Sequence, residues 1–68
     1  MLTGRIKFYS PRLGWGIVET PDNTGYFMHG TDYDGGVFPG PIPGEHVQFE
    51  MRRTEKGRRA VLVTQVKQ

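Results

Sequence analysis

The sequence contains no cysteine, and it has only one serine and one tryptophan. Without thiols the chain can form neither a disulfide framework nor a thiolate metal site, and it suits a reducing cytosol. No apolar stretch near the N-terminus is long enough for a signal peptide, and no run approaches the length of a membrane span. We therefore expect a cytoplasmic protein with no membrane partner.

Residues that could support catalysis or metal binding are scarce. The two histidines, His29 and His46, have neither cysteines nor suitably spaced carboxylates to complete a zinc site. Ser10 lies in a predicted turn, and nothing suggests an oriented base to activate it. Gly14-x-Gly16 is not a dinucleotide-binding motif, because no helix follows it. The lysine of a phosphate-binding loop is also absent. We predict that the protein is not an enzyme and has no catalytic residues, metal, cofactor or small-molecule substrate.

Glycine and proline are abundant instead, with ten and five copies in 68 residues. They interrupt every stretch that could form a long helix. The longest stretch without them, 45–56, carries Val47, Phe49 and Met51 at the period of two that is typical of a strand. The length allows one domain, so we expect a single all-β domain over residues 1–68. A domain this small buries only about 60% of its unfolded surface, which predicts marginal stability.

Turn-forming residues divide the chain into five predicted strands. These are Gly4–Tyr9, Gly14–Glu19, Tyr26–His29, Glu45–Arg53 and Arg59–Val66. The connection Gly30–Gly44 contains five glycines and three prolines, which exclude a strand there. A loop this long in a small domain is often functional. Tyr33 and Val37 within it could either pack or bind a partner.

The alternation of side chains along each strand assigns the two faces of the sheet. The predicted core comprises Val18, Met28, Val47, Phe49, Met51, Val61 and Val63. Trp15, Phe27 and His29 then project from the outer face, and contiguous exposed apolar residues usually mark a binding site. The glycines on either side of Trp15 would let a flat ligand approach the sheet. Lys7 beside Phe8, with Arg12 just before the next strand, adds a basic patch among aromatics, as expected of a surface that stacks single-stranded bases.

The net charge of +2 conceals an uneven distribution. Residues 1–18 carry three lysines or arginines and no acid, and residues 19–50 carry six acids and no lysine or arginine. Residues 51–68 carry six lysines or arginines against one acid. If the terminal strands are neighbours, the basic regions merge into the electrostatic footprint of a polyanion-binding protein. A solvated surface without function explains the pattern equally well.

Two short motifs carry a family resemblance. Residues 13–18, Leu-Gly-Trp-Gly-Ile-Val, resemble the first ribonucleoprotein motif, and residues 26–29, Tyr-Phe-Met-His, resemble the second. Residues 7–9, Lys-Phe-Tyr, stand where the family has Lys-Trp-Phe. With further matches at Gly44, Gly57 and Ala60, the sequence resembles the bacterial cold-shock proteins over nearly the whole chain.

The resemblance implies a five-stranded antiparallel barrel of the OB type that binds single-stranded RNA or DNA through a stacked aromatic face. The contact residues it implies are Lys7, Phe8, Trp15, Phe27, His29, Phe38 and Lys56. To these we add Tyr9, Arg12, Ile17, Arg58 and Arg59 as predicted nucleic-acid contacts. The last two would extend a phosphate track along the final hairpin with Arg52 and Arg53.

Strict alternation creates one conflict with the resemblance, in the first predicted strand. It places Ile6 and Phe8 on the same face, whereas the family has the first in the core and the second on the binding face. We therefore expect a β-bulge or a sharp bend near Lys7.

Several positions depart from the family pattern. Leu13 replaces the basic residue of the first motif, Ile17 replaces its second aromatic, Gly25 replaces an acid, and Gly30 replaces the aromatic after the histidine. Two stacking positions are lost, each worth about 1–3 kcal/mol per base. The large ring of Trp15 and the hairpin arginines act in the other direction. We expect weaker stacking and a larger share of salt-dependent phosphate binding than in a typical member.

Two functions stay open at this point. The first is a monomeric binding module for single-stranded nucleic acid, with an RNA chaperone role. The alternative is a protein-binding barrel that kept the fold and repurposed its face. A hydrolase or nuclease is disfavoured because the sequence offers no catalytic constellation. RNA or DNA preference cannot be read from the sequence, because contacts to the 2′-hydroxyl leave no recognisable motif.

Overall fold

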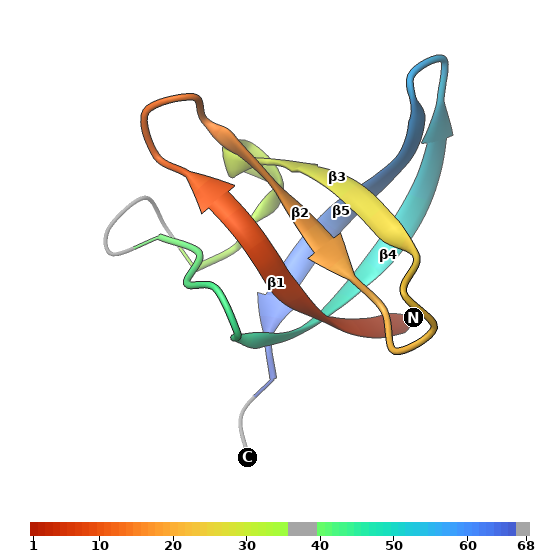
Figure 1. The fold of residues 1–68 in the computed structure, drawn as a ribbon, viewed down its shortest axis with the longest axis horizontal. Coiled ribbons are helices and arrows are strands. Elements are labelled where there is room, and N and C mark those ends of the chain that lie inside the picture. The colour runs from red at the N-terminus through yellow and green to blue at the C-terminus, as the bar shows by residue number, and fades with distance from the viewer. Residues whose placement is uncertain (36–39, 67–68) are drawn as a thin grey trace.

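The protein is described by a computed structural model that covers residues 1–35 and 40–66, and these form a closed five-stranded barrel (Figure 1). The strands are β1 (Leu2–Ser10), β2 (Trp15–Glu19), β3 (Gly25–His29), β4 (His46–Thr54) and β5 (Gly57–Gln65). A 3₁₀ helix, η1 (Gly30–Asp32), follows β3. Every predicted strand is present, with its ends displaced by at most two residues. Within the described ranges, no helix is long and apolar enough to cross a membrane.

The strands are ordered β1-β2-β3-β5-β4 around the barrel. The first three form an antiparallel meander, and β4 pairs antiparallel with both β1 and β5. The barrel closes where β5 runs parallel to β3, at the pair Phe27 and Arg59. This arrangement confirms the predicted OB-type barrel. β1 lies beside β4, but it pairs there with residues 46–49 of the acidic stretch and not with the basic residues from Arg52 onward. This pairing therefore does not merge the two basic regions of the sequence.

The core fills the inside of the barrel with side chains from every strand. Its members are Ile6, Val18, Tyr26, Met28, Tyr33, Val47, Phe49, Ala60 and Val63. Phe49 is fully buried and meets the ring of Tyr26 edge-on at 5.1 Å between centroids. Truncating a buried phenylalanine to alanine typically costs about 3–5 kcal/mol. Phe49 is therefore the main apolar anchor of the barrel.

The expected irregularity in β1 is present at Lys7. Ile6 pairs with Val18, whereas Phe8 pairs with Ile17, so Lys7 is an extra residue on the β1 side of the ladder. The bulge reverses the alternation. Ile6 is therefore buried at 1% exposure, while Phe8 emerges on the outer face at 42%.

The predicted core was wrong at Met51 and Val61. A second register shift leaves β5 with an extra residue opposite Gln48–Glu50 of β4, and Leu62 adopts a positive φ of 51° there. Alternation resumes one residue late, so Ala60 and Val63 are buried while Val61 is only partly buried. Met51 is 43% exposed, because its strand there runs beyond the core. Figure 1 shows the β4–β5 hairpin extending past the barrel.

Tyr33 ties the long connection after β3 to the barrel. Its ring is buried, its backbone bridges to Val63, and its hydroxyl donates a hydrogen bond to Glu45 Oε1 at 2.8 Å. Burial, followed by the hydrogen bond and the charge of Glu45, raises the pKa of Tyr33 to about 12. Tyr33 is thus a packing residue. Val37 and Phe38 lie outside the described residues.

Candidate functional site

The outer face of β1, β2 and β3 carries four aromatic side chains in mutual contact, here called the ring cluster: Phe8, Trp15, Phe27 and His29. Trp15 stacks on Phe27 with 5.2 Å between ring centroids and an interplanar angle of 23°. Phe8 meets Trp15 edge-on at 5.5 Å, and His29 meets Phe27 edge-on at 4.8 Å. Adjacent strands present these rings side by side because Trp15 pairs with His29 in the ladder.

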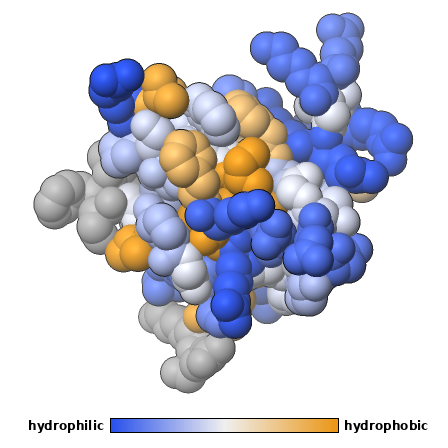
Figure 2. Space-filling view, viewed as in Figure 1, coloured by the Kyte–Doolittle hydropathy of each residue, from blue (hydrophilic) through white to orange (hydrophobic). Residues whose placement is uncertain are grey.

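Alternation explains why these rings are outside the barrel. Val18 and Met28 fill the inner face of the same strands at 0% exposure. Ile17 lies between the rings, since it pairs with both Phe8 and Phe27. Figure 2 shows hydrophobic residues gathered in the middle of this view of the molecule, with hydrophilic side chains around them and on the hairpin tip. The result is an exposed, largely apolar surface.

The sequence suggested that Gly14 and Gly16 let a flat ligand approach the ring of Trp15. In the structure, both glycines have roles in the backbone instead. Gly16 is buried, and a Cβ there would overlap the carbonyl oxygen of Phe8 and crowd the ring of Tyr9. Gly14 has a φ of 79° in the β1–β2 turn, a conformation that favours glycine. Both glycines therefore shape the meander that carries Trp15.

A basic hollow lies beside the ring cluster, between β3 and the β4–β5 turn. We call it the hairpin hollow, and its lining residues are Phe27, His29, Thr54, Glu55, Lys56, Arg58 and Arg59. Phe27 and His29 thus belong both to the ring cluster and to this hollow. A stacking surface and a cationic groove are adjacent here, which is the combination that single-strand binders use.

Arg59 forms the better-defined of the two ion pairs within the described residues. Its Nε donates to Asp32 Oδ2 at 2.9 Å and its Nη2 donates to Oδ1 at 3.1 Å. The backbone N–H of His29 donates to the same Oδ2 at 3.0 Å. The hydrogen bonds from Arg59 to Asp32 raise the pKa of Arg59 above its usual value. Sequence reasoning missed Asp32, because nothing in the chain connects it with a residue 27 positions away.

The remaining predicted residues are more scattered. Lys7 is exposed and pairs with Glu19 at 3.3 Å, a contact that contributes little to stability at a surface. Arg12 is exposed in the β1–β2 turn. Tyr9 is half-buried and packs against the core, apart from the ring cluster. Phe38 lies outside the described residues.

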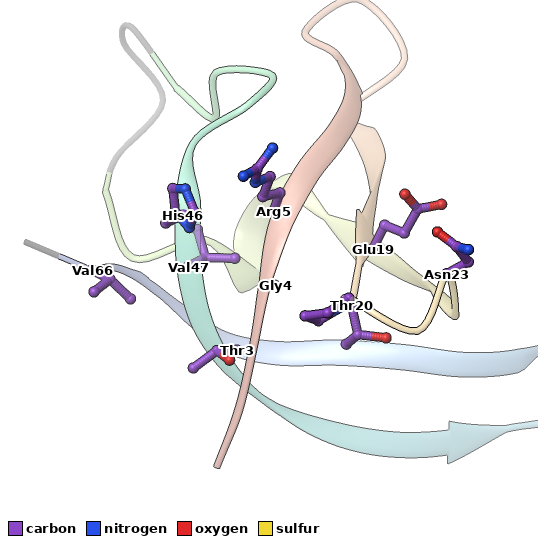
Figure 3. Close-up of a pocket in the computed structure, with 10 residues that line it drawn as sticks. Thr3, Gly4, Arg5, Glu19, Thr20, Asn23, His46, Val47 and Val66 are labelled. Carbon is purple, nitrogen blue, oxygen red and sulfur yellow. The ribbon is translucent and has the colours of Figure 1, made fainter.

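A second hollow lies by the N-terminal half of β1, where Arg5, Glu19 and His46 are among its lining residues (Figure 3). Its wall combines a guanidinium, a carboxylate and an imidazole around the backbone of Gly4. In the parts of the chain that the structure covers, no three His, Cys, Asp or Glu side chains are grouped so as to hold a metal ion. Among its described lining residues there is no phenylalanine, tyrosine or tryptophan.

The closed barrel places the protein in the class of OB-type barrels, here with an exposed ring cluster. Comparison with known sequences identifies the family. No protein-family model matches the chain. It is 30% identical over 64 residues to the cold shock-like protein CspD of Bacillus cereus, covering 94% of this chain and 97% of that protein. It is 29% identical over 66 residues to the cold shock-like protein CspLB of Listeria monocytogenes, covering 97% and 100%. The chain belongs to the cold-shock protein family.

Proposed function

We propose that the protein binds single-stranded RNA or DNA as a non-catalytic module, stacking bases on the ring cluster while cations of the hairpin hollow contact phosphates. The ring cluster carries this proposal, because its rings lie in contact on an exposed face. Every base has a π-face, so such a surface tolerates many sequences. Membership of the cold-shock family supports the same function.

Phosphate contacts would come from the lysines and arginines around the rings. Lys56 and Arg58 line the hairpin hollow, and no ion pair engages either of them among the described residues. Lys7 precedes Phe8 in β1, Arg12 lies in the turn between β1 and β2, and both are exposed. Because the family resemblance implies stacking aromatics at the positions of Ile17 and Gly30, these cations provide a larger share of the affinity.

Binding of this kind opposes base pairing. A base stacked on Trp15 or Phe27 is withdrawn from any helix, so the protein stabilises the open strand. We propose an RNA chaperone role on this ground.

A protein-binding barrel is the second candidate. Leu62 is 63% exposed and Met51 is 43% exposed on the hairpin, outside the ring cluster. Exposed apolar side chains of this kind could support contact with another protein. In that case oligonucleotides would bind feebly and the ring cluster would be covered by the partner.

Fluorescence of Trp15 tests the proposal directly, because it is the only tryptophan in the sequence and stands within the ring cluster. Short pyrimidine-rich single strands of DNA and RNA are titrated at low and at physiological salt, with a duplex as control. Saturable quenching by single strands but not by the duplex supports stacking on Trp15. Absence of quenching at low salt overturns the proposal and favours the protein-binding barrel.

A further inference from the structure

One row of paired residues crosses the outer face of four strands. Phe8 of β1 pairs with Ile17 of β2, Ile17 with Phe27 of β3, and Phe27 with Arg59 of β5. Directly paired residues project from the same face of a sheet. The side chain of Arg59 therefore emerges beside Phe27, and both line the hairpin hollow.

Arg59 is held in a fixed orientation by Asp32. The carboxylate accepts from Nε and from Nη2, a bidentate geometry that fixes the plane of the guanidinium. Side-chain exposure is 34% for Arg59 and 11% for Asp32, so the pair is partly shielded from solvent. Asp32 is itself anchored by the backbone N–H of His29, at the end of β3.

We propose that Asp32 is a positioning residue that holds the Arg59 guanidinium as a further planar surface, on which a base stacks next to Phe27. The inference rests on the proposed function and assigns Arg59 a role in stacking rather than in phosphate binding. Guanidinium planes stack nucleobases in the way that aromatic rings do. Arg59 then supplies part of the stacking surface that the replacements at Ile17 and Gly30 remove.

The ion pair itself argues against a phosphate contact. Asp32 occupies the Nε–Nη2 edge of the guanidinium, so a phosphate could approach Arg59 only through the Nη1–Nη2 end. Asp32 also cancels the charge of Arg59, so the pair attracts a phosphate weakly. Lys56 and Arg58 line the same hollow and carry the charge there.

The substitution Arg59→Lys separates the two roles, because lysine keeps the charge and loses the plane. Binding is measured by anisotropy of labelled single strands, intact or with one base removed at successive positions, over a range of salt. We expect Arg59→Lys to weaken binding of the intact strand about tenfold, within the range of one stack, without changing the salt slope. At one abasic position, that of the base stacked on Arg59, removal of the base should weaken binding by the unmodified protein but should not weaken binding by Arg59→Lys any further.

A matched control and a double-mutant cycle complete the test. Arg5→Lys makes the same chemical change in the second hollow and should bind like the unmodified protein. Asp32→Asn should weaken binding in the unmodified protein but not in the Arg59→Lys background, since Asp32 acts through Arg59. Urea unfolding confirms that each variant is folded under the binding conditions.

Three results would overturn the inference. Equal affinity of Arg59→Lys and the unmodified protein for the intact strand excludes a stacking role. A salt slope that becomes shallower by about 0.7 in Arg59→Gln identifies a phosphate contact instead. Equal losses from Asp32→Asn in both backgrounds show that Asp32 acts through the fold alone. None of these outcomes contradicts the proposed function. Absence of binding by the unmodified protein would contradict both the proposed function and the inference about Arg59.

Discussion

Trp15 is the central ring of the cluster, in contact with Phe8 on one side and Phe27 on the other. We predict that Trp15→Ala weakens binding of single strands by about 5-fold to 150-fold, the range expected for one lost stack. Anisotropy of a labelled oligonucleotide measures the change. Leu62→Ala removes an exposed apolar side chain on β5 and should leave the affinity unchanged. An unaltered affinity in Trp15→Ala would mean that bases do not stack on this ring.

Gly16 illustrates how a single residue permits the close approach of β1 to β2. An added Cβ would overlap the backbone of Phe8 and Tyr9. Gly16→Ala should therefore lower the free energy of unfolding by about 1–3 kcal/mol, the usual cost of overpacking. Gly25→Ala is the control, because its Cβ would meet Ile17 at 3.5 Å, an ordinary contact. Urea unfolding compares the two, and equal stability would contradict this account of Gly16.

At the level of elements, β2 and β3 could be predicted from sequence because strict alternation runs between clear turn signals. The bulge in β1 could also be predicted, because the family resemblance places Ile6 in the core and Phe8 on the binding face. The bulge in β5 could not be predicted. A leucine at positive φ is unfavourable, and nothing in the local sequence marks Leu62 for that conformation. The Asp32–Arg59 pair was equally inaccessible, because it depends on the closure of β3 against β5.

Tyr33, in the connection after β3, makes the stability of the fold decrease at alkaline pH. Its pKa rises from 10.0 to about 12 on folding, so this contribution to stability is complete below pH 10 and is lost as the pH approaches 12. The loss reaches about 1.4 kcal/mol per pH unit for one proton. We predict that the stability advantage over Tyr33→Phe, about 1 kcal/mol at neutral pH from one hydrogen bond, disappears near pH 11.

Urea unfolding of both proteins at several alkaline pH values measures this difference. Other titratable groups are common to the two proteins and cancel. A difference in free energy of unfolding that stays constant across this pH range would show that folding does not raise the pKa of Tyr33.

Across the whole molecule, the exposed cations proposed to contact phosphates lie at two places: Lys7 and Arg12 on β1 and the turn after it, and Lys56 and Arg58 at the hairpin hollow. We predict that the logarithm of the binding constant falls with the logarithm of salt concentration with a slope between about −1.4 and −2.8, corresponding to two to four phosphate contacts on a single strand. Titrations at several salt concentrations measure the slope. Substituting both Lys56 and Arg58 by glutamine should make it shallower by about 1.4. A slope near zero would show that phosphates contribute nothing.

The position of β5 between β3 and β4 also has a consequence for synthesis on the ribosome. The ring cluster is encoded within the first 29 residues, whereas the strand that seals the barrel runs from Gly57 to Gln65. A nascent chain therefore carries its aromatic meander with the edge of β3 still unpaired until β5 has been translated. Folding of the barrel waits for its last strand, and during that interval the exposed rings and the free edge are open to wrong partners.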